Sequence, residues 1–243
     1  MRELDTRPAT PDAWPTPYAK GGVVGKGKVM RGLFWIAVVA GASYSLTAWG
    51  LAEVGAWQAA WKTSGVALLA LWAATQARNI DGWLIAAALA LGALGDLLLE
   101  THGFTTGGAA FAAGHAVAIV LYLRNRRADP SSSQKLLGYL LAPATILISA
   151  LLAAPAGQAL PTGTYAAFLG VMAATAWMSR FPRYRVGIGA VLFVVSDLLI
   201  FARFGVLKES VVPGLLIWPT YFAAQALIAW GVVQTLSSDQ RVP

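Results

Sequence analysis

Residues 83–99 read Trp83-Leu-Ile-Ala-Ala-Ala-Leu-Ala-Leu-Gly-Ala-Leu-Gly-Asp96-Leu-Leu-Leu, and this stretch decides the fold. Asp96 is its only charged side chain, and a membrane-spanning helix needs about 20 mostly apolar residues of this kind. A second apolar run, Val191-Leu-Phe-Val-Val-Ser-Asp197-Leu-Leu-Ile-Phe, also encloses an aspartate. A carboxylate at membrane depth costs about 2.5–3.5 kcal/mol on insertion scales, so both aspartates are candidates for a functional role.

The composition of the whole chain also indicates a membrane protein. The 243 residues are 57% hydrophobic and 12% charged, with a mean hydropathy of +0.61, whereas a soluble domain is about 25% charged. The absence of cysteine excludes a disulfide framework, a thiol nucleophile and a cysteine-ligated metal. The net charge of +7 does not predict a nucleic-acid partner, because basic residues in membrane proteins usually set topology.

The other apolar runs repeat the pattern and predict an all-α fold, a bundle of eight transmembrane helices. Because the connections are short, we expect one transmembrane domain over residues 31–236. We predict a disordered basic tail rich in Pro and Gly at residues 1–30, in preference to a cleaved signal, and a short C-terminal tail at 237–243. The predicted spans are 32–51, 57–77, 82–100, 107–124, 136–154, 162–180, 186–204 and 212–235.

The Lys and Arg residues predict the orientation of the bundle. With eight spans both termini lie on one side of the membrane, and fifteen of the 18 basic residues fall on that side. The other three are Lys62, Arg203 and Lys208. Cytoplasmic loops are enriched in Lys and Arg, so we expect the N- and C-termini to be cytosolic. The short loops favour the bacterial inner membrane as the location.

With this topology, polar side chains from separate spans lie at a similar depth in the outer half of the membrane. Asp96 and Glu100, for example, lie at i and i+4 on one face of the third span. Scattered polar residues would not be expected to share one depth, so we predict that they form a site. The candidates are Lys62, Asp96, Glu100, His115, Ser196, Asp197, Arg203, Tyr221 and Gln225.

Each of these residues also has a structural interpretation. Asp96 forms an ion pair with Lys62 in one alternative, and Asp197 is held by Ser196 or Arg203 in another, because intramembrane charges usually find partners. For the neutral members of the set, the alternative is a hydrogen bond between packed helices.

The absence of several known motifs limits the classes of catalysis that the sequence supports. Zinc catalysis takes three protein ligands, and His115 is the only histidine within a span, with no His-x-x-x-His or Glu-x-x-His pair. We therefore expect no metal and no cofactor, although two aspartates and His115 remain an alternative ligand set. No serine-hydrolase elbow and no nucleotide-binding loop is present. Two separate carboxyl groups favour general acid–base catalysis, with one protonated and the other ionised.

At these residues the chain resembles the YhhN-type lysoplasmalogenase family of polytopic membrane enzymes. The order of the motifs and the eight-helix layout extend the resemblance over residues 31–235. One difference lies at the start of the second span, where the family typically has Lys-Pro and this chain has Lys62-Thr63. The matching motifs are Gly-Asp-Leu-Leu-Leu from Gly95 to Leu99, Phe-x-x-Gly-His from Phe111 to His115, Gly-Ala-x-x-Phe-x-x-Ser-Asp from Gly189 to Asp197, and Pro-x-Tyr-x-x-x-Gln from Pro219 to Gln225.

The resemblance implies hydrolysis of the vinyl ether bond of lysoplasmalogens, giving a fatty aldehyde and glycerophosphoethanolamine or glycerophosphocholine. The family's proposed catalytic aspartates correspond to Asp96 and Asp197. One carboxyl would protonate the outer alkene carbon, and the other would stabilise the resulting oxocarbenium ion and take a proton from water. We hypothesise that Asp197 is the ionised partner, because Ser196 and Arg203 would favour its charge. Arg203 and Lys62 alternatively bind the phosphate of a lysophospholipid that enters from the bilayer.

Two other functions remain open at this point: a small proton-coupled transporter and a hydrolase of another lysolipid. Transporters also place acids within the membrane and are often built from repeats. In this chain the third and seventh spans both contain an aspartate followed by Leu-Leu. The polar residues, however, gather toward one face of the membrane, and no polar trail reaches the cytosolic side, which favours the hydrolase.

Overall fold

The structure, a computed structural model, describes residues 21–52, 55 and 57–239, and within these residues the named elements are all helical. The predicted all-helical fold is confirmed. In the described part of the chain, three short elements lie between eight long helices. The short elements are α2 (Ser45–Ala48), η1 (Ala154–Ala156) and η2 (Arg183–Gly187). The long helices are α1 (Gly21–Ser43), α3 (Gln58–Gln76), α4 (Ile80–His102), α5 (Phe104–Arg124), α6 (Ser132–Ala153), α7 (Ala159–Met178), α8 (Ile188–Phe204) and α9 (Val212–Asp239).

Five helical segments in the described part of the chain are long and apolar enough to cross a membrane, by length and composition. The long helices α1, α3 and α7 are not among them. The number and order of the long helices agree with the sequence analysis, whereas crossing by all eight stays a prediction. The five segments are Ile80–His102, Phe104–Arg124, Ser132–Ala156, Arg183–Phe204 and Val212–Asp239.

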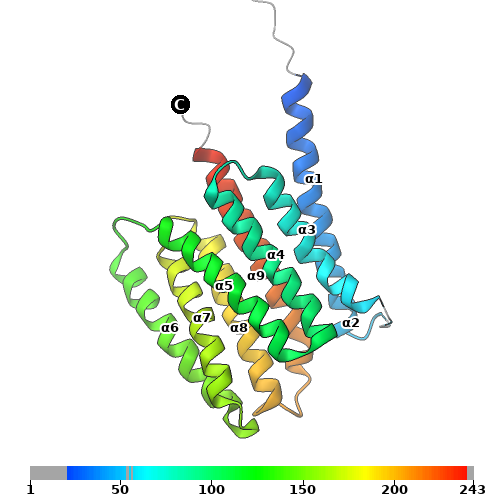
Figure 1. The fold of residues 1–243 in the computed structure, drawn as a ribbon, viewed down its shortest axis with the longest axis vertical. Helices are drawn as coiled ribbons and strands as arrows, with labels where there is room; N and C mark the ends of the chain where they lie inside the picture. The colour runs from blue at the N-terminus through cyan, green and yellow to red at the C-terminus, as the bar shows by residue number, and fades with distance from the viewer. Residues whose placement is uncertain (1–20, 53–54, 56, 240–243) are drawn as a thin grey trace, which may run out of the picture.

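The long helices run up and down through the bundle, so that α1 begins and α9 ends at the same end (Figure 1). We call this the terminal end, and we call the opposite end, where α4 ends and α5 begins, the distal end. The start of α1 and the end of α9 on one side agree with an even number of long helices. The cytosolic location of the terminal end remains a prediction.

The first long helix differs from its prediction at both ends. α1 begins at Gly21, inside the predicted tail, because each residue added to an existing helix gains a backbone hydrogen bond without a new nucleation step. The rest of that tail, residues 1–20, lies outside the described residues. At the other end α1 stops at Ser43, whose hydroxyl donates to the Ala40 carbonyl at 2.8 Å. α2 then forms a separate turn.

The turn between α4 and α5 fixes the distal end of the bundle. It consists of one residue, Gly103, with a φ of 80°. Glycine reaches this left-handed region without the steric penalty that a Cβ imposes. α4 and α5 therefore lie side by side, which brings the ends of α4 and α5 together at the distal end.

Polar contacts join several helices at the terminal end. Arg124 and Asn125 both bond the Asp81 carboxylate, at 2.7 and 3.0 Å, and thereby link the end of α5 to the start of α4. Arg180 donates to the Asn125 side chain at 2.8 Å and pairs with Asp239 at 2.7 Å. α9 therefore extends to Asp239, past the predicted start of the C-terminal tail at residue 237; residues 240–243 lie outside the described part of the chain.

Glycines let α1, α3 and α9 approach closely beside the site. A Cβ added to Gly65 of α3 would overlap the Cα of Gly41 on α1, and it would lie 2.9 Å from the Phe222 ring of α9. The Gly41 carbonyl accepts a hydrogen bond from the buried Trp218 indole of α9 at 2.7 Å. This packing sets α9 against α1 and α3 at the level where α9 carries Tyr221.

Candidate active site

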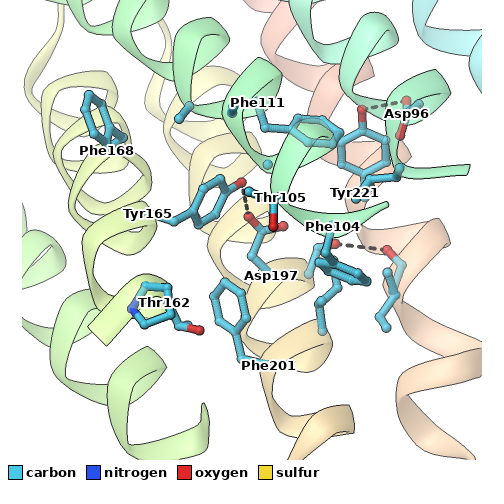
Figure 2. Close-up of a pocket in the computed structure, with 18 of the residues that line it drawn as sticks. Asp96, Phe104, Thr105, Phe111, Thr162, Tyr165, Phe168, Asp197, Phe201 and Tyr221 are labelled. Carbon is cyan, nitrogen blue, oxygen red and sulfur yellow. Dashed lines mark hydrogen bonds between the residues drawn. The ribbon is translucent and has the colours of Figure 1, made fainter. Parts of the chain in front are cut away.

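The distal half of the bundle contains a cavity with a volume of about 500 Å³. Side chains from α3, α4, α5, α7, α8 and α9 line it, and most of the lining is apolar. Asp96 and Asp197, the two aspartates singled out from the sequence, both face this cavity (Figure 2). The volume lies within the range of about 300–1,000 Å³ that is typical of small-molecule sites.

Asp96 lies on α4 and its side chain is buried. Its Oδ2 accepts a hydrogen bond from the Tyr221 hydroxyl at 2.8 Å, and the Gln225 amide donates to the same hydroxyl oxygen at 3.2 Å. Tyr221 and Gln225 lie one turn apart on α9, on one helix face. Gly92 makes room for this pair, because a Cβ there would lie 2.8 Å from the Gln225 amide nitrogen.

Asp197 lies on α8 and is held in a similar way from the other side of the site. Its Oδ2 accepts a hydrogen bond from the Tyr165 hydroxyl of α7 at 2.7 Å. His115 Nε2 lies 3.2 Å from the same hydroxyl oxygen. Because the hydroxyl proton is directed at Asp197, His115 satisfies this contact when Nε2 carries a hydrogen and donates it.

Each aspartate therefore belongs to a short chain of hydrogen bonds: Gln225–Tyr221–Asp96 on one side and His115–Tyr165–Asp197 on the other. Aromatic rings pack between the two chains. Phe193 contacts both His115 and Tyr221 edge to face, with centroid separations of 5.0 and 5.2 Å. Figure 2 shows the two carboxyl groups on different parts of the cavity wall, with Asp197 toward Tyr165 and Asp96 beside Tyr221. Packing fixes both tyrosines, so both carboxyl groups are held in place.

The alternative in which Lys62 forms an ion pair with Asp96 is not seen among the described residues, where Lys62 pairs with Glu100. Lys62 Nζ lies 2.7 Å from Glu100 Oε1, and their side chains are 16% and 29% exposed. Glu100 lies one turn beyond Asp96 toward the distal end of α4, nearer to the surface, where an ion pair loses less hydration. Lys62 still lines the cavity, so a cation is present on the Asp96 side.

The contacts expected for Asp197 with Ser196 and Arg203 are also absent among the described residues. The Ser196 hydroxyl donates to the Ile217 carbonyl at 3.1 Å and thereby links α8 to α9. Arg203 is exposed near the end of α8, with its guanidinium 5.5 Å from the centre of the Phe204 ring. It does not line the cavity. Two turns of α8 separate Arg203 from Asp197, too far along the helix for the expected contact.

Tyr165 was not among the residues predicted from the sequence, although its hydroxyl is the hydrogen-bond partner of Asp197 within the described residues. A signal for it in the sequence is its position, because Tyr165 lies in the second turn of α7, near the distal start of that helix. His115 contacts the Tyr165 hydroxyl and Gln225 contacts the Tyr221 hydroxyl. Both His115 and Gln225 line a smaller cavity of about 30 Å³. Within the described residues, no three or more His, Asp or Glu side chains are grouped to hold a metal ion.

The fold and the cavity together define a class of protein: an all-helical protein with helices apolar enough to cross a membrane and two buried carboxyl groups facing one internal cavity. The profile of the YhhN family matches residues 57–232 of the chain, and the chain belongs to this family. The resemblance seen in the sequence motifs is thereby confirmed. A search of the curated proteins found no match, and neither did a search of the solved structures.

Proposed function

We propose that the protein is an integral-membrane hydrolase that cleaves the vinyl ether bond of a lysoplasmalogen, releasing a fatty aldehyde and a glycerophosphodiester. Membership in the YhhN family supports a membrane hydrolase. The observation that carries the proposal is the pair of buried carboxyl groups, Asp96 and Asp197, which face one apolar cavity and each accept a tyrosine hydrogen bond. Vinyl ether hydrolysis needs a proton donor and a stabiliser of positive charge, and two carboxyl groups supply both.

The positions of the charges favour Asp197 as the proton donor, the reverse of the hypothesis from sequence. Lys62 is the one cationic side chain of the described residues that lines the cavity. Its partner, Glu100, lies one turn from Asp96 on α4, so the ammonium group lies on the Asp96 side. A nearby cation favours the ionised form of a carboxyl group. Asp96 is therefore the carboxylate in this proposal. Asp197, whose hydrogen-bond partner among the described residues is Tyr165, carries the proton.

In the first step Asp197 gives its proton to the outer alkene carbon, and the double-bond electrons form the new C–H bond. The carbon next to oxygen becomes an oxocarbenium ion, which the Asp96 carboxylate stabilises. Water adds to that carbon and loses a proton to Asp96, which gives a hemiacetal. In the collapse Asp96 returns this proton to the departing ether oxygen, while Asp197 takes the hydroxyl proton. Aldehyde and alcohol leave, and both carboxyl groups regain their starting forms.

The polarity of the cavity also suggests how a lysolipid would lie in it. The Lys62–Glu100 pair provides one positive and one negative group at the distal end of α3 and α4. A phosphate with an attached amine is a zwitterion, so its two charges complement this pair. The glycerophosphate part of the substrate would lie there, with the vinyl ether between the aspartates. Arg203 has no role in this arrangement.

We further propose that all eight long helices span the membrane, with both termini cytosolic in a bacterial inner membrane. The common end of α1 and α9 and the gathering of Lys and Arg there support this orientation. The cavity would then open in the outer half of the bilayer, and the substrate would come from the membrane.

A proton-coupled transporter has less support than a hydrolase. Transport requires access to the binding site from both sides of the membrane. In the terminal half of the bundle, Trp72, Leu121, Tyr122 and Phe181 are almost completely buried in a continuous core. A hydrolase of another lysolipid would use the same cavity, and the choice between the two depends on the bond that is cleaved.

The test is mass spectrometry of the purified protein incubated with vinyl-ether and acyl-ester lysolipids of equal chain length. We expect aldehyde from the vinyl ether and no fatty acid from the ester. Fatty acid from the ester alone would assign the protein to another hydrolase class. Transport without cleavage, measured in liposomes, would support the rival function.

A further inference from the structure

The cavity has an opening at the surface of the bundle, between the distal halves of α5 and α7. Several residues both line the cavity and are exposed: Thr105 and Ala109 from α5, and Pro161, Thr164 and Phe168 from α7. A residue that is exposed and also lines a cavity lies at its opening. The cavity therefore communicates with the lateral surface of the bundle, the surface that lipid chains would cover in a membrane.

Aromatic rings at two helix ends border the opening on its distal side. The rings of Phe104 and Phe204 pack edge to face with centroids 5.0 Å apart, which joins the start of α5 to the end of α8. Towards the terminal end, α5 contacts α7 through His115 and Tyr165. The opening lies between these two contacts, and Phe168 borders it on the α7 side, away from Asp96 (Figure 2).

Gly108 lies in the middle of the α5 face that lines the opening. Phe104 and Ala112, one turn before and one turn after it, line the same cavity. A Cβ placed on Gly108 would meet nothing within 4 Å. The position therefore has open space in front of it, and a side chain added there would extend toward the cavity without displacing its neighbours.

The charged pair and the opening lie on different sides of the cavity. Lys62 projects from α3 and Asp96 from α4, whereas the opening is bordered by α5 and α7. Asp197 lies between Asp96 and Phe168 in the close-up (Figure 2). A molecule that fits this order has a charged end, a reactive group in the middle and a hydrocarbon chain that leaves through the opening.

We propose that the α5–α7 opening holds the single hydrocarbon chain of the substrate, and that Gly108 is a specificity-determining residue that leaves space for this chain. The inference rests on the proposed function for the identity of the reacting bond, but chain binding is measurable without cleavage. A larger residue at position 108 would shorten the space for the chain.

The experiment compares Gly108→Trp with Gly214→Trp as a matched control. Gly214 lies in the first turn of α9, is exposed, does not line the cavity, and also has nothing within 4 Å of a built Cβ. The probe is a saturated alkyl-ether lysolipid with a photoactivatable diazirine near the end of its chain. This probe has no vinyl ether double bond, so labelling reports binding alone.

We expect the wild-type protein and Gly214→Trp to be labelled on residues 104–112 or 161–168, with the loss of labelling confined to Gly108→Trp. Each methylene excluded from an apolar site lowers affinity about fourfold, so exclusion of three lowers it on the order of 50-fold. Among cleavable substrates, a short-chain lysolipid should retain its kcat in Gly108→Trp, whereas a long-chain one should show a raised KM. Gly108→Leu, a smaller change, provides the same comparison if the tryptophan variant does not fold.

Undiminished labelling of Gly108→Trp, or labelling of the wild-type protein on other helices, would overturn the inference. Failure of the proposed function has a different signature. In that case the wild-type protein would release no aldehyde from any vinyl-ether lipid, while the labelling pattern and its dependence on Gly108 would persist.

Discussion

The hydroxyl group of Tyr221 provides a sharp test of how Asp96 is held. In Tyr221→Phe the ring stays in its aromatic packing, and only the hydroxyl that donates to Asp96 at 2.8 Å is lost. A hydrogen bond to a charged group contributes about 1.5–3 kcal/mol. If this bond positions the Asp96 carboxylate in the transition state, kcat falls about 10- to 150-fold.

Tyr122→Phe is the matched control. Tyr122 is a fully buried tyrosine on α5, and its hydroxyl has no hydrogen-bond partner in the part of the chain that the structure describes. Removal of that hydroxyl leaves no partner unsatisfied, so we expect activity within about twofold of wild type and no loss of stability. The two variants thus make the same chemical change at a site residue and at a core residue.

The assay measures the initial rate of aldehyde release by detergent-purified protein, with thermal unfolding recorded for each variant. We expect a reduced kcat for Tyr221→Phe, with a smaller change in KM. Equal rates for Tyr221→Phe and Tyr122→Phe would refute the positioning of Asp96 by Tyr221. A lower rate that matched the fraction of unfolded protein would refute it as well.

Two further predictions concern the cation near the site and the packing behind it. Lys62→Met should raise the KM for a zwitterionic lysolipid by about tenfold, because one charge-assisted contact is lost. Arg203→Met, outside the cavity, is the control and should leave the kinetics unchanged. Equal effects of the two substitutions would refute this role for Lys62. Gly65→Ala should lower the unfolding free energy by about 1–3 kcal/mol, because the added methyl group overlaps Gly41. Thermal unfolding should therefore show a lowered melting temperature. An unchanged melting temperature would contradict the close approach of α1 and α3.

Much of the architecture could be predicted because lipid imposes a simple requirement. In lipid, the backbone N–H and C=O groups of a long apolar run must form hydrogen bonds with one another, and a helix allows this. The exact ends of the helices depend on local contacts that hydropathy does not report. α1 ends at Ser43 within an apolar run, and α9 continues past its apolar run to Asp239, which pairs with Arg180.

The two carboxyl groups of the site could be predicted from the sequence, but their hydrogen-bond and ion-pair partners could be predicted less well. An aspartate in an apolar run is conspicuous, so Asp96 and Asp197 could be singled out from the sequence. Their partners depend on how the helices are rotated against one another, which one sequence does not determine. A Lys62–Asp96 pair was one alternative from the sequence, whereas Lys62 pairs with Glu100 in the structure. Tyr165 was not predicted, because a tyrosine in a spanning helix is also typical of packing.

The central claim is that a carboxyl group protonates carbon and that both aspartates are required. Its most direct test is mass spectrometry of the products formed in D₂O by wild type, Asp96→Asn and Asp197→Asn. The account predicts that wild type releases an aldehyde with one deuterium on the carbon next to the carbonyl, and that neither asparagine variant releases aldehyde while both remain folded. Undeuterated aldehyde, or wild-type activity in either variant, would contradict it.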